Sequence, residues 1–189
     1  QGNSTIFIHQ DNPYLTQIAW GLNPVTYGEE DNLYINGHVT GNSPYLTFEW
    51  KAGKAGERHE VQTQLIGDYN FPNALAAITI GHFFGVEAAK IDRALHEYEP
   101  RNNRSQLKKT ADNTLIIDAY NANPTSMLAA IGNFHNMQAG GKMLILGDMR
   151  ELGKDSPGEH QKIVDCLEEY GFKDVALVGE LFAATRHTY

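Results

Sequence analysis

The sequence predicts an α/β protein whose C-terminal part is a Rossmann-like parallel sheet with flanking helices. From Leu107 onward, short apolar runs alternate with helix-prone segments, an order typical of a doubly wound parallel sheet. Residues 115–127 join an apolar strand to a helix through a polar loop, and α/β proteins place ligands at such junctions. Residues 1–66 are β-rich instead, and two helices follow them.

The β-rich part predicts an antiparallel meander with hairpin turns. Short strands of apolar residues, most of them alternating with polar ones, are expected at 5–8, 25–27, 33–35, 45–50 and 60–66. Asn36-Gly37, Gly41-Asn42 and the glycines of 53–56 are typical of the loops between such strands. Asn12 and Pro13 mark a turn, or alternatively cap a helix over 15–20.

The rest of the chain predicts helices and strands in a regular order. We expect helices at 73–80 and 87–98, strand 114–117, helix 125–138, strand 143–146, helix 157–170, strand 174–178 and the start of a further helix. Pro72 suits the first turn of the first helix, and Gly85 interrupts the pattern after it. Residues 100–104 are polar and begin with a proline, which indicates a linker between a domain at 1–100 and a domain at 101–189.

Composition excludes several classes of protein. The 189 residues contain 23 Asp and Glu against 15 Lys and Arg, which argues against a nucleic-acid surface. The single cysteine, Cys166, cannot form an internal disulfide, is expected to be a small core residue, and fits the reducing cytoplasm. No apolar run approaches the roughly 18 residues of a membrane span. Because the chain begins with Gln1 and stops soon after a strand, we expect a piece of a longer protein.

The polar loop of residues 118–126 is the first candidate site. Asp118 follows a buried-looking strand, where its carboxylate can accept hydrogen bonds from a ribose diol or can cap the next helix. Asn121 and Asn123 offer amide donors and acceptors, but asparagine is also an ordinary turn residue.

A second strand-to-loop junction lies at residues 143–153. Its loop either carries a turn glycine with solvated Asp148, Arg150 and Glu151, or lines the same crevice as the first loop. His160 follows on a helix, where a lone histidine is more often structural than catalytic.

Other candidates stand outside these junctions. Asn70 and Asn73 lie at a helix start, where they can read an adenine edge, although capping by Asn70 is the simpler interpretation. Arg104, in the linker, can reach a phosphate or can be solvated. The chain contains no G-x-x-x-x-G-K-[ST] phosphate loop, no G-x-G-x-x-G, no C-x-x-C and no H-E-x-x-H. The residues alone therefore indicate a nucleotide- or small-ligand-binding protein without a complete catalytic constellation.

Four motifs together resemble those of the Mur ligases, in the same order and spacing. They are G-D-Y-N-F-P-N-A-L-A-A at 67–77, N-R-S-Q at 103–106, I-D-A-Y-N-A-N-P-T-S-M at 117–127, and L-G-D-M-R-E-L-G at 146–153 followed by His160. Any one of these motifs would be a weak signal, whereas four in order are a specific one.

The resemblance implies a three-domain, ATP-dependent ligase that activates a carboxylate as an acyl phosphate for attack by an amine. The Y-N-A-N-P and G-D-M-x-E-L-G elements imply UDP-N-acetylmuramoyl-tripeptide as the acid and D-Ala-D-Ala as the amine, in peptidoglycan synthesis. Residues 1–100 would be the latter part of the central ATP-binding domain, and 101–189 a truncated C-terminal domain. The phosphate loop and the Mg²⁺ ligands would precede Gln1, so the chain alone is expected to be inactive and to hold no metal.

The resemblance also implies roles for individual residues, position by position. Asn70 and Asn73 match asparagines near the adenine, Arg104 matches a catalytic linker arginine near the phosphates, Asp118 matches a carboxylate near the ribose, and Tyr120, Asn121, Asn123 and Ser126 match the dipeptide side of the site. The chain departs from the family at Tyr69, where a histidine is common, and at Ile117, where many members have a second aspartate.

Two alternatives stay open beside this hypothesis. One is a sibling ligase that adds another amino acid, or adds glutamate to folate, although siblings carry other residues in place of Y-N-A-N-P. The other is a non-catalytic module that holds a nucleotide or a protein partner. For either ligase we expect a cytoplasmic monomer that acts on small-molecule substrates. We expect neither a nucleic acid nor a membrane as a partner.

Overall fold

The computed structural model describes residues 5–101 and 103–189. Asn102, which belongs to the predicted linker, lies outside the described residues. The chain forms two compact units: unit 1 is Gln1–Arg101 with Ser105–Leu107, and unit 2 is Asn102–Arg104 with Lys108–Tyr189. Each unit has a hydrophobic core of its own.

Unit 1 is built on a mixed sheet. Its elements are β1 (Phe7–His9), α1 (Pro13–Ile18), β2 (Val25–Gly28), β3 (Ile35–Asn42), β4 (Tyr45–Ala52), β5 (His59–Ile66), the 3-10 turn η1 (Asp68–Asn70), α2 (Phe71–Phe83) and α3 (Ala88–Glu97). The strands lie in chain order, β1-β2-β3-β4-β5. The β1–β2 and β2–β3 pairs are parallel, and only β3–β4 and β4–β5 are antiparallel.

The predicted antiparallel meander is therefore wrong for the first three strands. The physical reason is the connection between β1 and β2, which contains α1 and so returns the chain to the same end of the sheet. The predicted alternative of a helix after Asn12 is confirmed: its Oδ1 accepts hydrogen bonds from the amides of Tyr14 at 3.0 Å and Leu15 at 3.2 Å.

Asn36 and Gly37 lie inside β3, so the loop predicted there is also wrong. The buried Asn36 side chain donates to the carbonyl oxygens of Asp31 at 3.3 Å and Gly53 at 3.1 Å. A Cβ on Gly37 would lie 2.4 Å from the Glu49 carbonyl oxygen. Asn36 and Gly37 therefore lie where neighbouring backbone segments approach β3 closely, and not in a turn.

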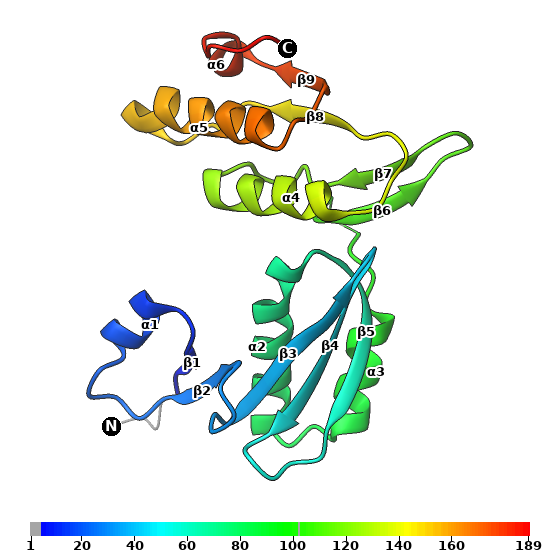
Figure 1. Cartoon of the computed structure of the whole chain (residues 1–189). Coiled ribbons are helices and arrows are strands. Elements are labelled where there is room, and N and C mark those ends of the chain that lie inside the picture. The colour runs from blue at the N-terminus through cyan, green and yellow to red at the C-terminus, as the bar shows by residue number, and fades with distance from the viewer. Residues whose placement is uncertain (1–4, 102) are drawn as a thin grey trace. The chain divides into compact units, whose positions relative to one another are not determined.

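Helices α2 and α3 cover one face of the sheet and enclose the core of unit 1 (Figure 1). The alternation of buried residues on β4 points Leu46, Phe48 and Trp50 at this face. Asp92 of α3 ties the helix to the sheet, because its carboxylate accepts from Trp50 Nε1 at 2.8 Å and lies 2.9 Å from His59 Nδ1. Helix α2 is longer than the predicted helix 73–80, and α3 nearly coincides with the predicted helix 87–98. Pro72 sits in the first turn of α2, as predicted.

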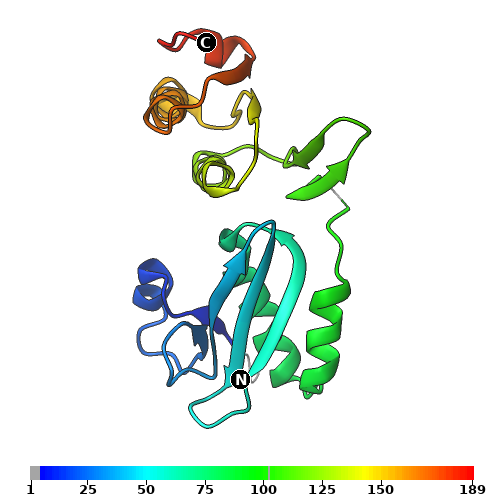
Figure 2. The same ribbon diagram turned by 45° about the vertical axis from the view of Figure 1, so that its right-hand side comes forward.

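Unit 2 contains the α/β alternation that the sequence predicts. Its elements are the second half of β6 (Gln106–Lys109, whose first two residues are assigned to unit 1), β7 (Thr114–Ile117), α4 (Pro124–Asn136), β8 (Met143–Gly147), the 3-10 turn η2 (Gly153–Asp155), α5 (Ser156–Glu169), β9 (Asp174–Val178) and α6 (Glu180–Ala183). Strands β8 and β9 form a parallel pair, in register from Met143↔Asp174 to Gly147↔Val178. Figure 2 shows α4 and α5 nearly end-on, side by side against this pair. No described helix is both long and apolar enough to cross a membrane.

Strand β6 is an element that the sequence reading missed. It forms a two-stranded sheet with β7, and the turn between them is closed by the Thr110 amide, which donates to the Asn113 carbonyl at 2.8 Å. The segment Q-L-K-K carries one large apolar residue in four, so it gives little strand signal. Its pairing with β7 accompanies the hydrogen bond by which Asn103, just before β6, contacts the loop after β7.

Cys166 of α5 behaves as the predicted small core residue. It packs at the edge of the unit 2 core. Burial raises the pKa of the Cys166 thiol, with a smaller contribution from the Glu169 carboxylate. The thiol is therefore a poor nucleophile at neutral pH.

Candidate functional site

The first candidate site is the loop between β7 and α4 in unit 2. Strand β7 ends at Ile117 and α4 begins at Pro124, so residues 118–123 form a strand-to-helix junction as predicted. Asp118, Tyr120 and Asn121 are exposed on it. The Ala119 amide donates to the Asn103 carbonyl at 2.8 Å, which fixes the start of the loop against the segment before β6.

Asn123, and not Asp118, caps helix α4. Its Oδ1 accepts a hydrogen bond from the Ser126 amide at 3.0 Å, and the Ser126 hydroxyl donates back to the Asn123 carbonyl at 3.2 Å. This is an N-cap of the usual geometry, with Pro124 in the first turn. The N-cap position of α4 is therefore occupied by Asn123 and not by Asp118. Both oxygens of Asn123 and the hydroxyl of Ser126 are therefore engaged locally.

Arg104 lies over the face of Tyr120. The guanidinium carbon is 3.8 Å from the ring centroid, well inside the range of a cation–π contact. Both residues belong to unit 2, and both are exposed. The structure thus brings the predicted phosphate residue and a predicted dipeptide residue together, a pairing that sequence reasoning did not foresee.

Asn70 and Asn73 lie at the start of α2 in unit 1. Asn70 does not cap the helix with its side chain; its Nδ2 donates to the Ile66 carbonyl at 2.9 Å. The predicted capping role is therefore wrong, and the bond instead holds η1 against the end of β5. Asn73 is exposed in the first turn. Beside Asn70 is Tyr69, which stands where a histidine is common in the family. Its hydroxyl lies 2.7 Å from the Ser105 hydroxyl.

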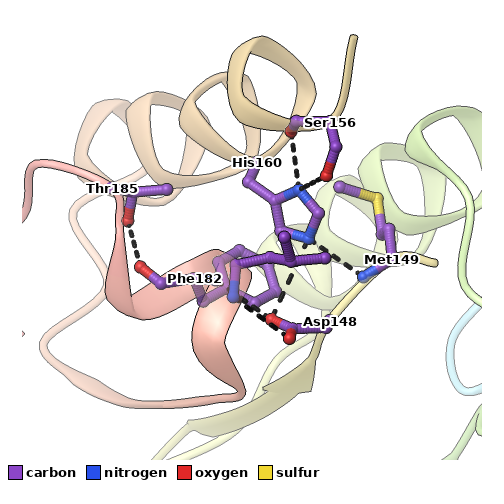
Figure 3. Close-up of polar contacts among 7 residues, drawn as sticks. Asp148, Met149, Ser156, His160, Phe182 and Thr185 are labelled. Atoms are coloured by element: carbon purple, nitrogen blue, oxygen red, sulfur yellow. Dashed lines mark hydrogen bonds and ion pairs between the residues drawn. The ribbon is translucent and has the colours of Figure 1, made fainter. Parts of the chain in front are cut away.

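Asp148 follows β8 and binds the start of α6. Its two carboxylate oxygens accept hydrogen bonds from the amides of Leu181 at 3.1 Å and Phe182 at 3.0 Å (Figure 3). Only 13% of the side chain is exposed, so the prediction of a solvated aspartate is wrong. Gly179 makes room for the carboxylate: a Cβ there would lie 2.1 Å from Asp148 Oδ2. This contact joins residues far apart in sequence, and no local pattern could have revealed it.

His160 is a buried structural residue. Its ring lies 2.7 Å from the Ser156 carbonyl through Nδ1 and accepts from the Met149 amide through Nε2 at 3.0 Å (Figure 3). Because the carbonyl can only accept and the amide can only donate, these partners assign the proton to Nδ1 and leave the ring neutral. The histidine is 0% exposed, which agrees with the structural interpretation.

The other two charged residues of the second junction are exposed. Arg150 and Glu151 face solvent as the simpler alternative predicted. Two residues of this loop are left-handed, Glu151 at φ 66° and Gly153 at φ 55°, so the predicted turn glycine is confirmed at Gly153. Among the residues that the structure describes, no group of three or more His, Cys, Asp and Glu side chains could hold a metal ion.

Comparison with known proteins identifies the origin of these features. Residues 103–187 match the family model described as Mur ligase, glutamate ligase domain. A curated relative from Bacillus subtilis, named UDP-N-acetylmuramoyl-tripeptide–D-alanyl-D-alanine ligase, is 44% identical over 151 residues, which are 78% of this chain and 32% of the relative. The Escherichia coli protein of the same name is 30% identical over 86% of this chain and 35% of its own length.

Solved structures give the same result. A crystal structure of MurF from Acinetobacter baumannii superimposes with a TM-score of 0.85 at 25% identity, covering 97% of this chain and 40% of that protein. MurF ligase from Thermotoga maritima, solved in complex with ADP, has a TM-score of 0.80 at 17% identity, over 96% of this chain and 42% of that protein. The chain spans about a third of the length of the B. subtilis and E. coli relatives. Its motifs, its fold and its relatives agree: the chain belongs to the Mur ligase family.

Proposed function

We propose that the protein containing this chain is an ATP-dependent ligase that adds D-alanyl-D-alanine to UDP-N-acetylmuramoyl-tripeptide during peptidoglycan precursor synthesis. The observation that carries the proposal is the junction of residues 117–127, a strand-to-helix loop with the sequence I-D-A-Y-N-A-N-P-T-S-M. Supporting it, the chain is 44% identical to the B. subtilis enzyme of that name over 151 residues.

In this function Arg104 acts on the phosphates and is the catalytic residue of the chain. Activation of a carboxylate by phosphoryl transfer concentrates negative charge on the transferred group, and an arginine can neutralise that charge through a planar array of donors. Arg104 is exposed beside the loop after β7, where its guanidinium is accessible to a ligand.

The other polar residues bind the two substrates. Asp118 is proposed to accept the ribose hydroxyls, and Asn70 and Asn73 to contact the adenine. The dipeptide side comprises Tyr120, Asn121, Asn123 and Ser126. The side-chain oxygen of Asn123 and the Ser126 hydroxyl are already engaged in the helix cap. We therefore assign the hydrogen bonds donated to the dipeptide to the side-chain amides of Asn121 and Asn123. The cap itself fixes the backbone from which these donors project.

The phosphate loop and the Mg²⁺ ligands are proposed to lie outside this chain. The described residues contain no metal-binding cluster, and the sequence contains no phosphate-loop motif. Bound Mg²⁺ would supply charge neutralisation at the phosphates. The residues of this chain would complement it with the Arg104 cation.

The test is ligation by the full-length protein, offered a panel of free amino acids and dipeptides as the amine. We expect D-Ala-D-Ala to give product at least tenfold faster than any single amino acid. A preference for another amino acid would establish a sibling ligase, and failure to ligate any amine would favour a binding module. The isolated 189-residue chain is expected to make no product and to hydrolyse no ATP, and turnover by it would contradict the assignment of the phosphate loop to another segment.

Replacing Asp118 with alanine in the full-length ligase is expected to raise the KM for ATP about tenfold, with little change in the KM for the dipeptide. The loss corresponds to about 1.5 kcal/mol, the scale of a hydrogen bond to a charged group. Steady-state kinetics with ATP varied would measure it. Asp112→Ala is the matched control, because Asp112 is an exposed aspartate in the β6–β7 turn. An unchanged KM for ATP in Asp118→Ala would remove Asp118 from the nucleotide site.

A further inference from the structure

The contact between Arg104 and Tyr120 is built into the fold of unit 2. Arg104 lies just before β6, and Tyr120 follows β7, the partner of β6. The residues directly preceding them are joined by the hydrogen bond from the Ala119 amide to the Asn103 carbonyl, at 2.8 Å. This bond sets the two backbones side by side, so the next side chain on each can meet the other.

The backbone of Asn103 directs Arg104 to this position. Asn103 has φ 57°, in the left-handed region, which asparagine tolerates better than most residues. The turn that results presents the Arg104 guanidinium over the Tyr120 ring, 3.8 Å from its centroid. Tyr120 remains 61% exposed, so the contact does little to bury apolar surface. The main effect of the contact is to orient the Arg104 guanidinium.

We propose that Tyr120 is a positioning residue for Arg104, and that its ring face holds the guanidinium ready for the phosphates. This inference rests on the proposed function of Arg104. An arginine side chain has many rotamers, and the entropy lost on fixing it opposes any contact made only in the transition state. A ring that already restricts these rotamers lowers that loss before the nucleotide binds. The Tyr120 hydroxyl, at the far end of the ring, stays available to the dipeptide side.

The contact itself can be tested on the isolated 189-residue chain by NMR. A cation stacked on the ring experiences its ring current, so the Arg104 δ-methylene protons should be shifted upfield. We expect this shift to persist in Tyr120→Phe, which keeps the ring, and to vanish in Tyr120→Leu. A wild-type chain with no upfield shift at Arg104 would overturn the proposal.

The functional consequence is tested in the full-length ligase with a double-mutant cycle. Tyr120→Leu is expected to lower kcat about three- to tenfold, the scale of a cation–π contact between exposed and desolvated limits. In an Arg104→Ala background the same substitution should lower kcat less than twofold, because no guanidinium is left to orient. An equal loss in both backgrounds would show that Tyr120 acts independently of Arg104, and would overturn the proposal.

Two further readouts separate positioning from other roles. If the ring is needed only for Arg104, Tyr120→Phe should recover most of the kcat lost in Tyr120→Leu. The KM for D-Ala-D-Ala can still rise in Tyr120→Phe, because the hydroxyl is absent. A kcat for Tyr120→Phe as low as that of Tyr120→Leu would contradict the ring-face contact. Should the enzyme reject D-Ala-D-Ala and use another amino acid, the proposed function fails, while the same cycle run with that amino acid still measures the coupling between Arg104 and Tyr120.

Discussion

Replacing Arg104 with alanine in the full-length ligase is expected to lower kcat by about 10²- to 10³-fold, the largest effect on activity that this chain predicts. The magnitude is that of removing one preorganised group that stabilises developing charge in a transition state. The affinity for ATP should fall much less, because the contact strengthens as the phosphoryl group is transferred. Single-turnover rates and nucleotide binding, measured separately, give the two quantities.

The chain provides a matched control for this prediction. Arg101 is a second exposed arginine, three positions earlier in the sequence, and its guanidinium lies 3.5 Å from the Glu99 carboxylate. Arg101→Ala should leave kcat within twofold of the wild type. Arg104→Lys should recover only part of the loss, since lysine keeps the charge but lacks the planar donors. An unaltered kcat in Arg104→Ala would make Arg104 a solvated linker residue.

Replacing His160 with leucine is expected to destabilise unit 2 by about 3 kcal/mol, the largest effect on stability. Leucine fits the buried site but removes both ring nitrogens, so the Met149 amide loses its Nε2 acceptor and the Ser156 carbonyl loses the Nδ1 donor. Each buried polar group left unpaired costs about 1–3 kcal/mol. The edge contact of the ring with Phe182, at 4.7 Å between centroids, is lost as well.

Hydrogen exchange of the Met149 amide, with urea unfolding followed by circular dichroism, measures this loss. Both tryptophans, Trp20 and Trp50, belong to unit 1, so the tryptophan fluorescence transition should move less than the transition of unit 2. Glu168→Ala is the control, because Glu168 is exposed on the same helix and alanine keeps helix propensity. Unchanged exchange at Met149 in His160→Leu would show that the histidine contributes no structural bond.

The position of the candidate site in the chain was predictable from the sequence, but the contacts within it were less so. The junction after Ile117 was expected because an apolar strand, a polar loop and a proline-started helix follow one another locally. Which residue caps the helix was not decided by that pattern, since Asp118 and Asn123 both have the chemistry. The backbone path selected Asn123, whose oxygen lies 3.0 Å from the Ser126 amide.

Elements with strong local signals were located well. The predicted strands 114–117 and 174–178 coincide with β7 and β9, because apolar runs of that length bounded by polar or glycine residues admit few alternatives. Pairing between strands was less accessible. The parallel order of β1, β2 and β3, and the place of Gly37 inside β3, depend on residues far apart in the chain.

The sequence by itself therefore determined the positions of most helices and strands, the family motifs and the loop at which a ligand is expected, because hydrophobic period and turn chemistry act over a few residues. Only the tertiary structure decided that Asp148 binds the start of α6, that His160 is sealed in the core, and that Arg104 lies on Tyr120. The physical reason is common to all three. A carboxylate, an imidazole and a guanidinium each have several possible partners, and the actual partners come within hydrogen-bonding or stacking distance only when separate elements of the fold pack together.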